Sequence, residues 1–414
     1  LYKHREEVGA AVMMGKCDVP EDVIIDILLR LPVKSLLRFK CVSGSWCALI
    51  KSPRFITDHL ANHKNNNGRL LVHNYDPATD KYVFALYPDE TLALPVPVFQ
   101  YLDGISMDVA ARVLGPCNGI FCLFNHVDRA ALWNPATREF RVLPTLPSPN
   151  LPPELEMMEN ALFAANTLGF GLDPLTNDYK VVWIRTYGDD IHTLGHELVR
   201  HKHAAVYALS SDSWTDFKGV LPAKDVICGC SMVYTYMNGA FYWVASGKNN
   251  NMVLSFDFGG EVFQWVTEPE RPDQDSGCSY FVLYNDSIAR ILTEPNETQT
   301  ETSFHIWVMK EDHWTKEATI GPLPKAEIPL GFWKNGELLV AASSTGQLHL
   351  SDSTTLQLKD LGTKAVQVFV YSESLVSIKG GNYDFLSAMS IFRFQWNHLT
   401  DSDSCSDHTI DSTE

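Results

Sequence analysis

The chain has 414 residues, of which 45% are hydrophobic and 11% aromatic, and it carries a formal net charge of −17. Because single hydrophobic cores rarely grow beyond about 250–300 residues, this length predicts one large domain joined to a smaller one. The acidity argues against nucleic acid as a partner, since phosphate binding depends mainly on clustered Lys and Arg. A basic protein partner, or solubility alone, accounts better for the charge.

Residues 1–17 contain no apolar core long enough for a signal peptide, and no segment approaches the roughly 20 apolar residues of a membrane helix. We expect this segment to be a disordered or non-native leader. The nine Cys residues are scattered and odd in number, which fits buried thiols in a reducing compartment. Cys117 and Cys122 fall in a predicted hairpin, where we expect them to pack. These features predict a cytoplasmic protein.

Residues 18–62 predict a small module of three short helices. Glu21 stands three residues after Asp18, the spacing of a capping box at the start of a helix. Apolar residues then recur at helical spacing on one face until Pro32, which stops that helix. Two more helical runs follow, and a short amphipathic run at 53–60 closes the module.

This module contains more large apolar side chains than it can bury. About forty residues in three helices form a marginal core without staples or a partner. The surplus either packs onto the rest of the chain or forms a docking surface for another protein. The residue pattern leaves both alternatives open.

The module contains, in order, Val19-Pro20-Glu21-Asp22, Ile27-Leu28, Leu31-Pro32, Ser35-Leu36, Phe39, Cys41-Val42-Ser43 and Trp46. This pattern resembles an F-box, which binds the Skp adaptor of cullin-RING ubiquitin ligases. Two positions depart from that family's pattern: Val19 replaces the usual Leu, and Gly44-Ser45 replaces the basic residue commonly found before the Trp. The resemblance implies that the adaptor is bound by apolar residues on and between the helices. These are Val19, Pro20, Ile24, Ile27, Leu28, Leu31, Pro32, Leu36, Phe39, Val42 and Trp46.

From about residue 66 the apolar pattern changes from helical to alternating, with turn signals between strand-like runs. Asn-Gly or Asn-Asp pairs, which tolerate the positive φ angles of tight hairpins, stand at 118–119, 238–239, 285–286 and 335–336. Each hairpin is followed by a second one with a polar turn. A unit of four antiparallel strands thus recurs five times between about 113 and 362.

Four-strand units at this spacing are typical of a β-propeller. A pair of stacked β-sandwiches also gives alternating strands, but need not repeat the same turn order. A strand at 365–379 would complete a partial unit at 70–87 and close the ring. We expect a mainly β chain with a small α module: a three-helix F-box, then a kelch-like β-propeller of about six blades at 66–385, then a disordered acidic tail at 386–414.

Several segments resemble the plant F-box-associated domain: "GPCNGIFCL" (115–123), "LWNPATREFRVLP" (132–144), "LGFGLDPLTNDYKVV" (168–182) and "PLGFWKNGELLV" (329–340). Their combination and order most resemble S-locus F-box proteins, the pollen factors of S-RNase self-incompatibility. This resemblance implies a non-catalytic substrate receptor, which binds Skp and through it the cullin-RING ligase. Its targets would be non-self S-RNases, which are typically basic, in the pollen tube cytosol.

No catalytic or metal motif is complete. In "HTLGHELVRHKH" (192–203), His201 stands one residue too far from His196-Glu197 for the HExxH pattern, and we expect a solvated loop. Cys228-Gly229-Cys230 is too tightly spaced for a zinc knuckle. The glycines of "GFGLDP" (169–174) lack a phosphate-binding Lys. We therefore expect no cofactor, no metal and no enzymatic activity.

Residues 1–60 contain nine basic and seven acidic side chains, so the acidic excess lies further along the chain. We expect target specificity on the longest breaks in the repeat, since loops usually carry binding residues. These breaks are 146–165, 186–203, 268–279 and 294–303. Their acidic candidates for a basic target are Glu154, Glu156, Glu159, Asp189, Asp190, Glu270, Asp273 and Asp275. Two alternatives remain: an F-box receptor for a different target in plant signalling, or a propeller enzyme or lectin with an incidental helical N-terminus.

Overall fold

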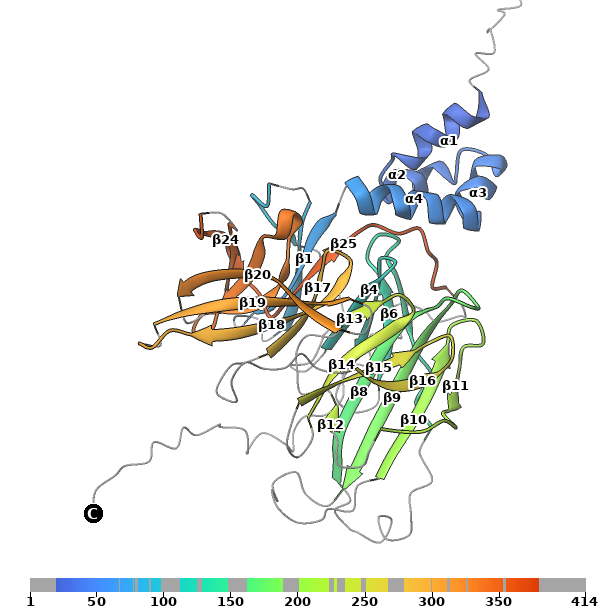
Figure 1. Cartoon of the computed structure of the whole chain (residues 1–414). Coiled ribbons are helices and arrows are strands. Elements are labelled where there is room, and N and C mark those ends of the chain that lie inside the picture. Colours follow the sequence, from blue (N-terminus) through green and yellow to red (C-terminus); the bar gives the residue numbers. More distant parts are fainter. Residues whose placement is uncertain are drawn as a thin grey trace, which may run out of the picture.

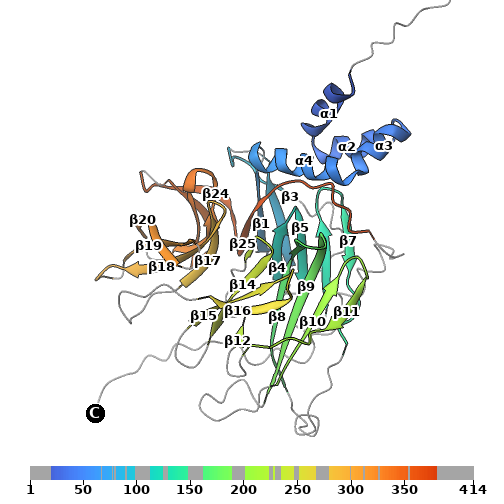
Figure 2. The same cartoon turned by 45° about the vertical axis from the view of Figure 1, so that its right-hand side comes forward.

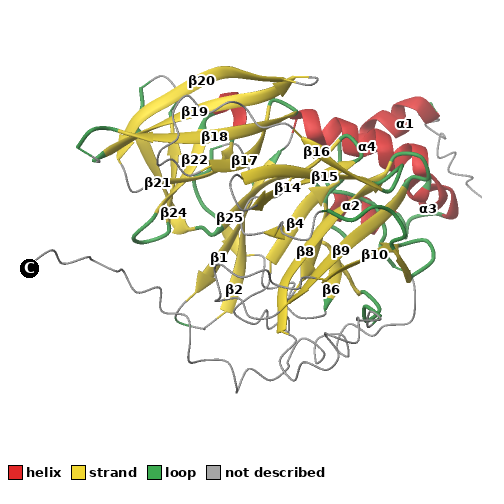
Figure 3. Ribbon diagram, turned by 60° about the horizontal axis from the view of Figure 1, so that its bottom comes forward, coloured by secondary structure: helices red, strands yellow, loops and turns green. Residues whose placement is uncertain are grey.

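The computed structural model describes residues 20–379 except 67, 77, 79–80, 89–90, 98–111, 125–128, 148–161, 189–200, 223–226, 229–234, 247–250, 267–278, 299, 311–312, 325–326 and 353–354. Within these ranges four α-helices precede 25 strands along the chain (Figure 1). The helices gather at one side of a mainly β molecule (Figure 3). The predicted leader and acidic tail lie outside the described residues.

The helical module consists of α1 (Glu21–Leu29), α2 (Val33–Phe39), α3 (Gly44–Lys51) and α4 (Pro53–Asn66). The run expected to close a three-helix module is a fourth helix, and it is the longest. Pro20 is the N-cap of α1 and offers no side-chain cap, while Asp18 of the predicted capping box lies outside the described residues. Ser43 does cap α3, since its Oγ accepts a hydrogen bond from the Trp46 backbone N–H at 3.2 Å.

The strands form six antiparallel sheets, which we number as blades in chain order. Blade 1 contains β25 (Gln367–Tyr371), β1 (Arg69–Asp76), β2 (Lys81–Tyr87) and β3 (Val96–Pro97); blade 2 contains β4 (Arg112–Cys117), β5 (Ile120–Phe124), β6 (Ala130–Asn134) and β7 (Glu139–Val142); blade 3 contains β8 (Leu162–Asp173), β9 (Asp178–Gly188), β10 (His201–Ala208) and β11 (Ser213–Asp216).

The other three blades follow the same order. Blade 4 contains β12 (Ile227–Cys228), β13 (Thr235–Met237), β14 (Ala240–Ser246), β15 (Asn251–Asp257) and β16 (Val262–Val266); blade 5 contains β17 (Ser279–Tyr284), β18 (Ser287–Pro295), β19 (Glu301–Lys310) and β20 (His313–Pro324); blade 6 contains β21 (Glu327–Phe332), β22 (Leu338–Ala342), β23 (Gln347–Ser351) and β24 (Leu358–Lys364). In blade 4 the first strand is split, because β12 and β13 both pair with β14.

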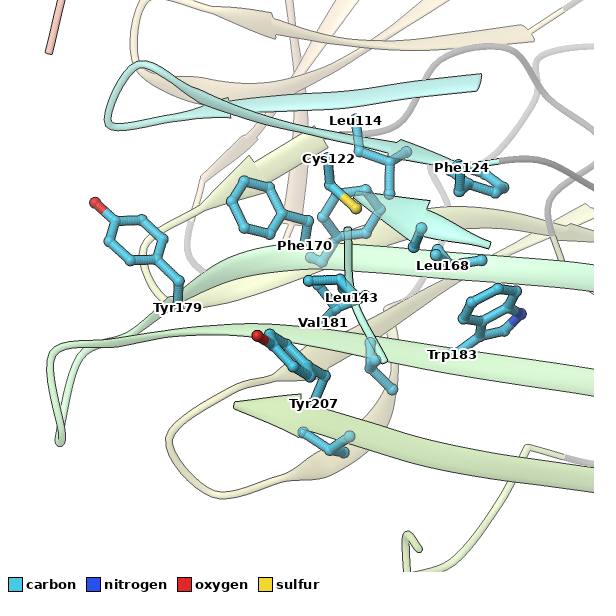
Figure 4. Close-up of a cluster of buried hydrophobic side chains, with 14 of the residues drawn as sticks. Leu114, Cys122, Phe124, Leu143, Leu168, Phe170, Tyr179, Val181, Trp183 and Tyr207 are labelled. Atoms are coloured by element: carbon cyan, nitrogen blue, oxygen red, sulfur yellow. The ribbon is translucent and has the colours of Figure 1, made fainter. Parts of the chain in front are cut away.

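The ring closes as the sequence predicts, although the closing strand is shorter than the expected 365–379 and ends at Tyr371. The last strand, β25, pairs antiparallel with β1 and places Phe369 opposite Leu71. A buried apolar cluster lies between each pair of neighbouring blades. Figure 4 shows part of the cluster that joins blades 2 and 3, where Cys122 packs beside Phe170. Cys117 and Cys122 are both buried, so their predicted packing is confirmed.

Tight turns occur at three of the four predicted Asn pairs. Asn118, Asn238 and Asn285 have φ angles of 50°, 49° and 48°, the left-handed conformation that two-residue hairpins require. The fourth pair differs, because residues 334–336 form a short 3-10 helix, η2 (Lys334–Gly336), between β21 and β22. The connection there is wider than a two-residue turn.

The glycines of "GFGLDP" serve packing between blades 3 and 4. A Cβ on Gly169 would lie 2.5 Å from Cζ2 of Trp243, and one on Gly171 would lie 2.3 Å from the Tyr236 ring. The absence of side chains therefore lets two aromatic rings of blade 4 lie against β8. The Trp243 indole N–H also donates to the Leu168 carbonyl at 2.7 Å.

The two faces of the propeller differ. Tight connections such as 118–119, 174–177 and 238–239 join strands on one face, which we call the short-turn face. Strands alternate in direction, so the ends that flank 148–161, 189–200 and 267–278 lie on the opposite, long-segment face. The helical module lies on the short-turn face, since it enters β1 beside the end of β25 (Figures 1 and 2).

Candidate docking surfaces

The helical module has a core of its own, to which the propeller contributes. Its fully buried members are Leu28, Val33, Leu36, Ile50, Phe55 and, from beyond β25, Leu375. The ring of Phe39 lies edge-on to that of Trp46, with centroids 5.4 Å apart. Some of these side chains therefore meet the propeller, as the first alternative expects, and others face solvent.

Helix α1 divides its apolar residues between core and solvent. Leu28 is 1% exposed, whereas Ile27 is 52% and Val23 42% exposed. The sequence predicts a single apolar face on this helix, but the helix has a second row of apolar residues. Val23 and Ile27, one turn apart, form this row, and it is exposed beside the buried residues. Exposed apolar side chains grouped on one element are typical of an interaction site.

The predicted adaptor-binding residues fall into three groups by burial. Pro20, Ile27, Pro32 and Val42 are exposed, with Val42 at 62%; Ile24, Leu31, Phe39 and Trp46 are half-buried; Leu28 and Leu36 are buried. Leu28 and Leu36 therefore hold the helices together beneath the surface. Val19 lies outside the described residues. Sequence reasoning missed Val23, although its spacing of four from Ile27 places both on one helix face.

Gly44 is the first residue of α3. No heavy atom lies within 4 Å of where its Cβ would be, so the position opens to solvent. The Ser43 and Ser45 hydroxyls lie 3.0 Å apart beside it. The F-box pattern's basic residue is therefore replaced here by a small, uncharged surface.

The candidate target-binding residues all lie outside the described residues: Glu154, Glu156, Glu159, Asp189, Asp190, Glu270, Asp273 and Asp275. The strands that flank them do show from which face these segments leave, and in each case it is the long-segment face. The fourth predicted break, 294–303, is half strand, since β18 ends at Pro295 and β19 begins at Glu301. Asn296 Oδ1 accepts hydrogen bonds from the backbone N–H groups of Thr300 at 2.9 Å and Glu301 at 3.2 Å, which makes a tight turn.

The His-rich run is part strand rather than all loop. His201 and His203 belong to β10, and the His203 ring lies 3.1 Å from Asp216 Oδ1 on β11. Within the described ranges, no three His, Cys, Asp or Glu side chains are grouped to hold a metal ion. No helix in the described part of the chain is long and apolar enough to cross a lipid bilayer.

Three of the groups with perturbed pKa values, His73, Glu327 and Asp173, belong to three different blades. Burial lowers the pKa of His73 on β1 to about 4. On blade 6, burial raises the pKa of Glu327, and the nearby His349, 3.6 Å away, opposes that rise. Burial of Asp173 is outweighed by hydrogen bonds from Thr176 and Lys180, which lower its pKa. Each shift follows from local packing or pairing.

Comparison with known proteins decides the family. The family described as "F-box associated beta propeller domain" matches residues 98–343, more than half of the chain, and the family "F-box domain" matches residues 17–58. The chain belongs to the plant F-box proteins with an F-box-associated β-propeller. Its helical module is thus an F-box, and the match to the associated domain spans blades 2 to 5 and the first two strands of blade 6.

Relatives in Arabidopsis thaliana agree with this assignment. The F-box protein At1g11270 is 30% identical to this chain over 63% of the chain and 80% of that protein. The F-box protein At5g10340 is 25% identical over 87% of the chain and 84% of that protein. Among solved structures, TolB from Acinetobacter baumannii is similar over 75% of this chain and 71% of that one, at 14% identity and a TM-score of 0.41. That likeness adds nothing to the topology described above.

Proposed function

We propose that this chain is a non-catalytic substrate receptor of a Skp–cullin–F-box ubiquitin ligase. The observation that carries the proposal is the set of exposed apolar side chains on the F-box, Val23, Ile27 and Val42. Leaving such side chains in water is unfavourable by about 25 cal/mol per Å² of apolar surface, and a partner surface removes that cost. The F-box family match points to a Skp adaptor as that partner.

In this proposal the propeller holds the target by its long-segment face while the F-box binds the ligase on the other face. The contribution of the chain is effective concentration and orientation, because tethering turns a bimolecular transfer into an intramolecular one. The residues proposed to hold the target are the acidic ones named above, on the segments that leave the long-segment face.

We further propose a basic protein as the target. The net charge of −17 and its concentration after residue 60 support this, since opposite charge speeds the encounter of two proteins. The resemblance of the motifs to S-locus F-box proteins makes a non-self S-RNase in the pollen tube cytosol the specific candidate. A different basic target in plant signalling would use the same charge.

The adaptor half is tested by measuring the affinity of purified Skp for the full chain and for Ile27→Asp and Val42→Asp. Both positions are more than half exposed, so the fold should persist. If they lie in the centre of the interface, each change costs about 2 kcal/mol or more, which is about 30-fold in affinity. Val220→Asp is the matched control, because Val220 is 88% exposed and follows β11 towards the long-segment face. Unchanged binding by both F-box variants would refute the adaptor surface.

The target half is tested with purified S-RNases and the full chain. Binding should weaken as salt rises, and should weaken further when Glu154, Asp189 and Glu270 are changed to Lys. Indifference to every S-RNase at low salt would refute the S-RNase proposal and leave the adaptor proposal untouched. Binding that ignores the charge reversals would place the target elsewhere on the propeller.

A further inference from the structure

The eight residues that follow β25, 372–379, form no helix or strand, yet they are closely packed. We call them the strap. The strap leaves the end of β25, runs beneath the helical module and crosses the end of blade 2 (Figures 1 and 2). It therefore contacts both parts of the molecule, and each contact can be followed residue by residue.

On the module side, the strap enters the core of the F-box. Leu375 is 2% exposed and belongs to the same buried cluster as Leu28 and Leu36. Glu373 Oε2 accepts a hydrogen bond from the Val33 backbone N–H at 3.0 Å. Pro32, the N-cap of α2, supplies no side-chain acceptor for the first turn of that helix. Glu373 thus satisfies a backbone donor that the local sequence leaves without one.

Glu373 also fixes the place where the module joins the propeller. Its Oε1 pairs with the guanidinium of Arg69, the first residue of β1, and both side chains are largely buried. A buried charged pair is maintained only while both partners stay in place, because one alone would carry an uncompensated charge. One carboxylate therefore connects α2, β1 and the strap.

On the propeller side, Asn134 at the end of β6 holds the strap. Its Nδ2 donates to the carbonyls of Ser374 at 3.1 Å and Val376 at 2.7 Å. Its Oδ1 accepts from the backbone N–H groups of Ala136 at 3.0 Å and Thr137 at 3.3 Å. Every donor and acceptor of this fully buried amide is used. Asn134 of the "LWNPATREF" segment thus stabilises the turn that follows β6 and binds two carbonyls of the strap.

The far end of the strap is anchored to β7. Glu139 accepts hydrogen bonds from the Ile378 backbone N–H at 2.8 Å and the Ser377 hydroxyl at 3.2 Å. Arg141 donates to the Ile378 carbonyl at 3.4 Å. The Ile378 side chain is 1% exposed in the cluster between blades 2 and 3. The strap is therefore attached to the propeller on both sides of Leu375.

We propose that the strap is a bracket that fixes the position of the F-box on the propeller, with Glu373, Leu375 and Asn134 as its positioning residues. Without it the module would be tied to the propeller by the chain link between α4 and β1 and by Ala136, which packs against the same cluster. With the strap, the module is attached at three places: at the start of β1 through Glu373, in the core of the module through Leu375, and at blade 2 through the hydrogen bonds of the strap. The geometric part stands on these contacts alone, while its consequence for ubiquitin transfer rests on the proposed function. A fixed F-box holds the target at a constant distance from the transferring enzyme, and such transfers fall steeply with misplacement.

The geometry is tested in the full chain by hydrogen–deuterium exchange. Glu373→Ala and Leu375→Ala should speed amide exchange in 33–39 and 372–378 by about tenfold or more, because each removes contacts that close this junction. Lys379→Ala is the matched control, since its side chain is 79% exposed and its nearest charge contact, Glu139, is 3.9 Å away. Exchange in β5 and β6 should stay at the wild-type rate in all three, which shows that the propeller remains folded.

A distance measurement supplies the second readout. Fluorophores placed through unnatural amino acids at the exposed positions Asp58 on α4 and Glu297 in blade 5 should give a narrow distance distribution in the wild type and a broader one in both strap variants. Unchanged exchange and an unchanged distribution in both variants would overturn the bracket. These results do not depend on whether Skp binds.

The consequence for transfer is tested in the reconstituted ligase, with the lysines of this chain as acceptors and mass spectrometry of the modified sites. The strap variants should bind Skp with wild-type affinity but spread ubiquitin over more lysines than the wild type does. An unchanged site pattern, despite a broadened distance distribution, would overturn the positioning role. Failure of the wild type to bind Skp would refute the proposed function and leave the bracket to the two preceding measurements.

Discussion

The contact between Gly169 and Trp243 predicts the effect of adding a single methyl group. In Gly169→Ala the new Cβ would lie 2.5 Å from Cζ2 and 3.0 Å from Cη2 of the indole, and 3.0 Å from Cγ1 of Val182. Ordinary van der Waals contact begins near 3.4 Å, so the ring must shift by about 1 Å. The indole is 1% exposed and hydrogen-bonded at its other edge, and it has little room to move.

The magnitude follows from what the ring loses by moving. Overpacking a close-packed core costs about 1–3 kcal/mol, and we expect Gly169→Ala to fall within that range. In a Trp243→Phe background the two nearest atoms are absent, which leaves the Val182 contact and a cost below about 1 kcal/mol. The two changes should therefore be coupled by about 1–2 kcal/mol. Trp243→Phe by itself costs about 2–4 kcal/mol, since it leaves a cavity and an unpaired Leu168 carbonyl.

The assay is urea unfolding followed by far-ultraviolet circular dichroism, for the four members of the cycle. Gly44→Ala is the matched control, because nothing lies within 4 Å of its Cβ position and Ala suits the first turn of α3. That variant should be neutral or up to about 1 kcal/mol more stable. The reasoning is refuted if Gly169→Ala unfolds at the wild-type urea concentration, or if its cost is as large in the Trp243→Phe background.

Three further predictions concern titration, reactivity and ring closure. Burial lowers the pKa of His73 from 6.5 to about 4, so the unfolded chain takes up the proton first, and stability falls as the pH drops from about 6.5 to about 4. The loss reaches about 3 kcal/mol, and His73→Phe should remove it from urea midpoints measured across that range. Iodoacetamide should modify the exposed Cys41 in the native chain and spare Cys122, whose pKa is raised by burial; equal labelling before unfolding would contradict this. Ending the chain after Val366 removes β25 and exposes the edge of β1, and we expect an aggregating product, whereas a soluble, protease-resistant one would contradict the closure.

The sequence was sufficient for the architecture because the propeller repeats its local rules. Alternating apolar residues recur in the strands, Asn-Gly or Asn-Asp pairs recur in blades 2, 4, 5 and 6, and positive φ angles at Asn118 and Asn238 meet the requirement that the pairs imply. The closing strand β25 could be predicted because the unit at 70–87 lacks a strand and one strand is left over after the last full unit. The same reasoning failed at 335–336, where η2 replaces a hairpin, because a turn pair restricts its own backbone and not the length of its connection.

The exposed apolar surface of the F-box was predicted only in part, since a periodic pattern gives a helix face but not what lies against it. Ile27 and Leu28 both fit the apolar pattern of α1, yet one faces solvent and the other the core. Which is which depends on α4 and on Leu375, which is more than 340 residues away in the chain. The role of Glu373 was equally out of reach, because no local pattern indicates a cap supplied to a helix from the other end of the protein.

Because the F-box lies on the short-turn face, substitutions near the module and longer connections on the opposite face have different structural consequences. Near the module, Asn134 and Glu139 each serve a blade and the strap at once, and Ala136 packs against the core cluster of the module, so a substitution there disturbs two parts of the molecule. On the opposite face the flanking strands end away from every helix, and lengthening a connection there costs only about 0.6 kcal/mol for each doubling. Under the proposed function, the connections that hold a target can therefore change on one face without disturbing attachment to the ligase on the other.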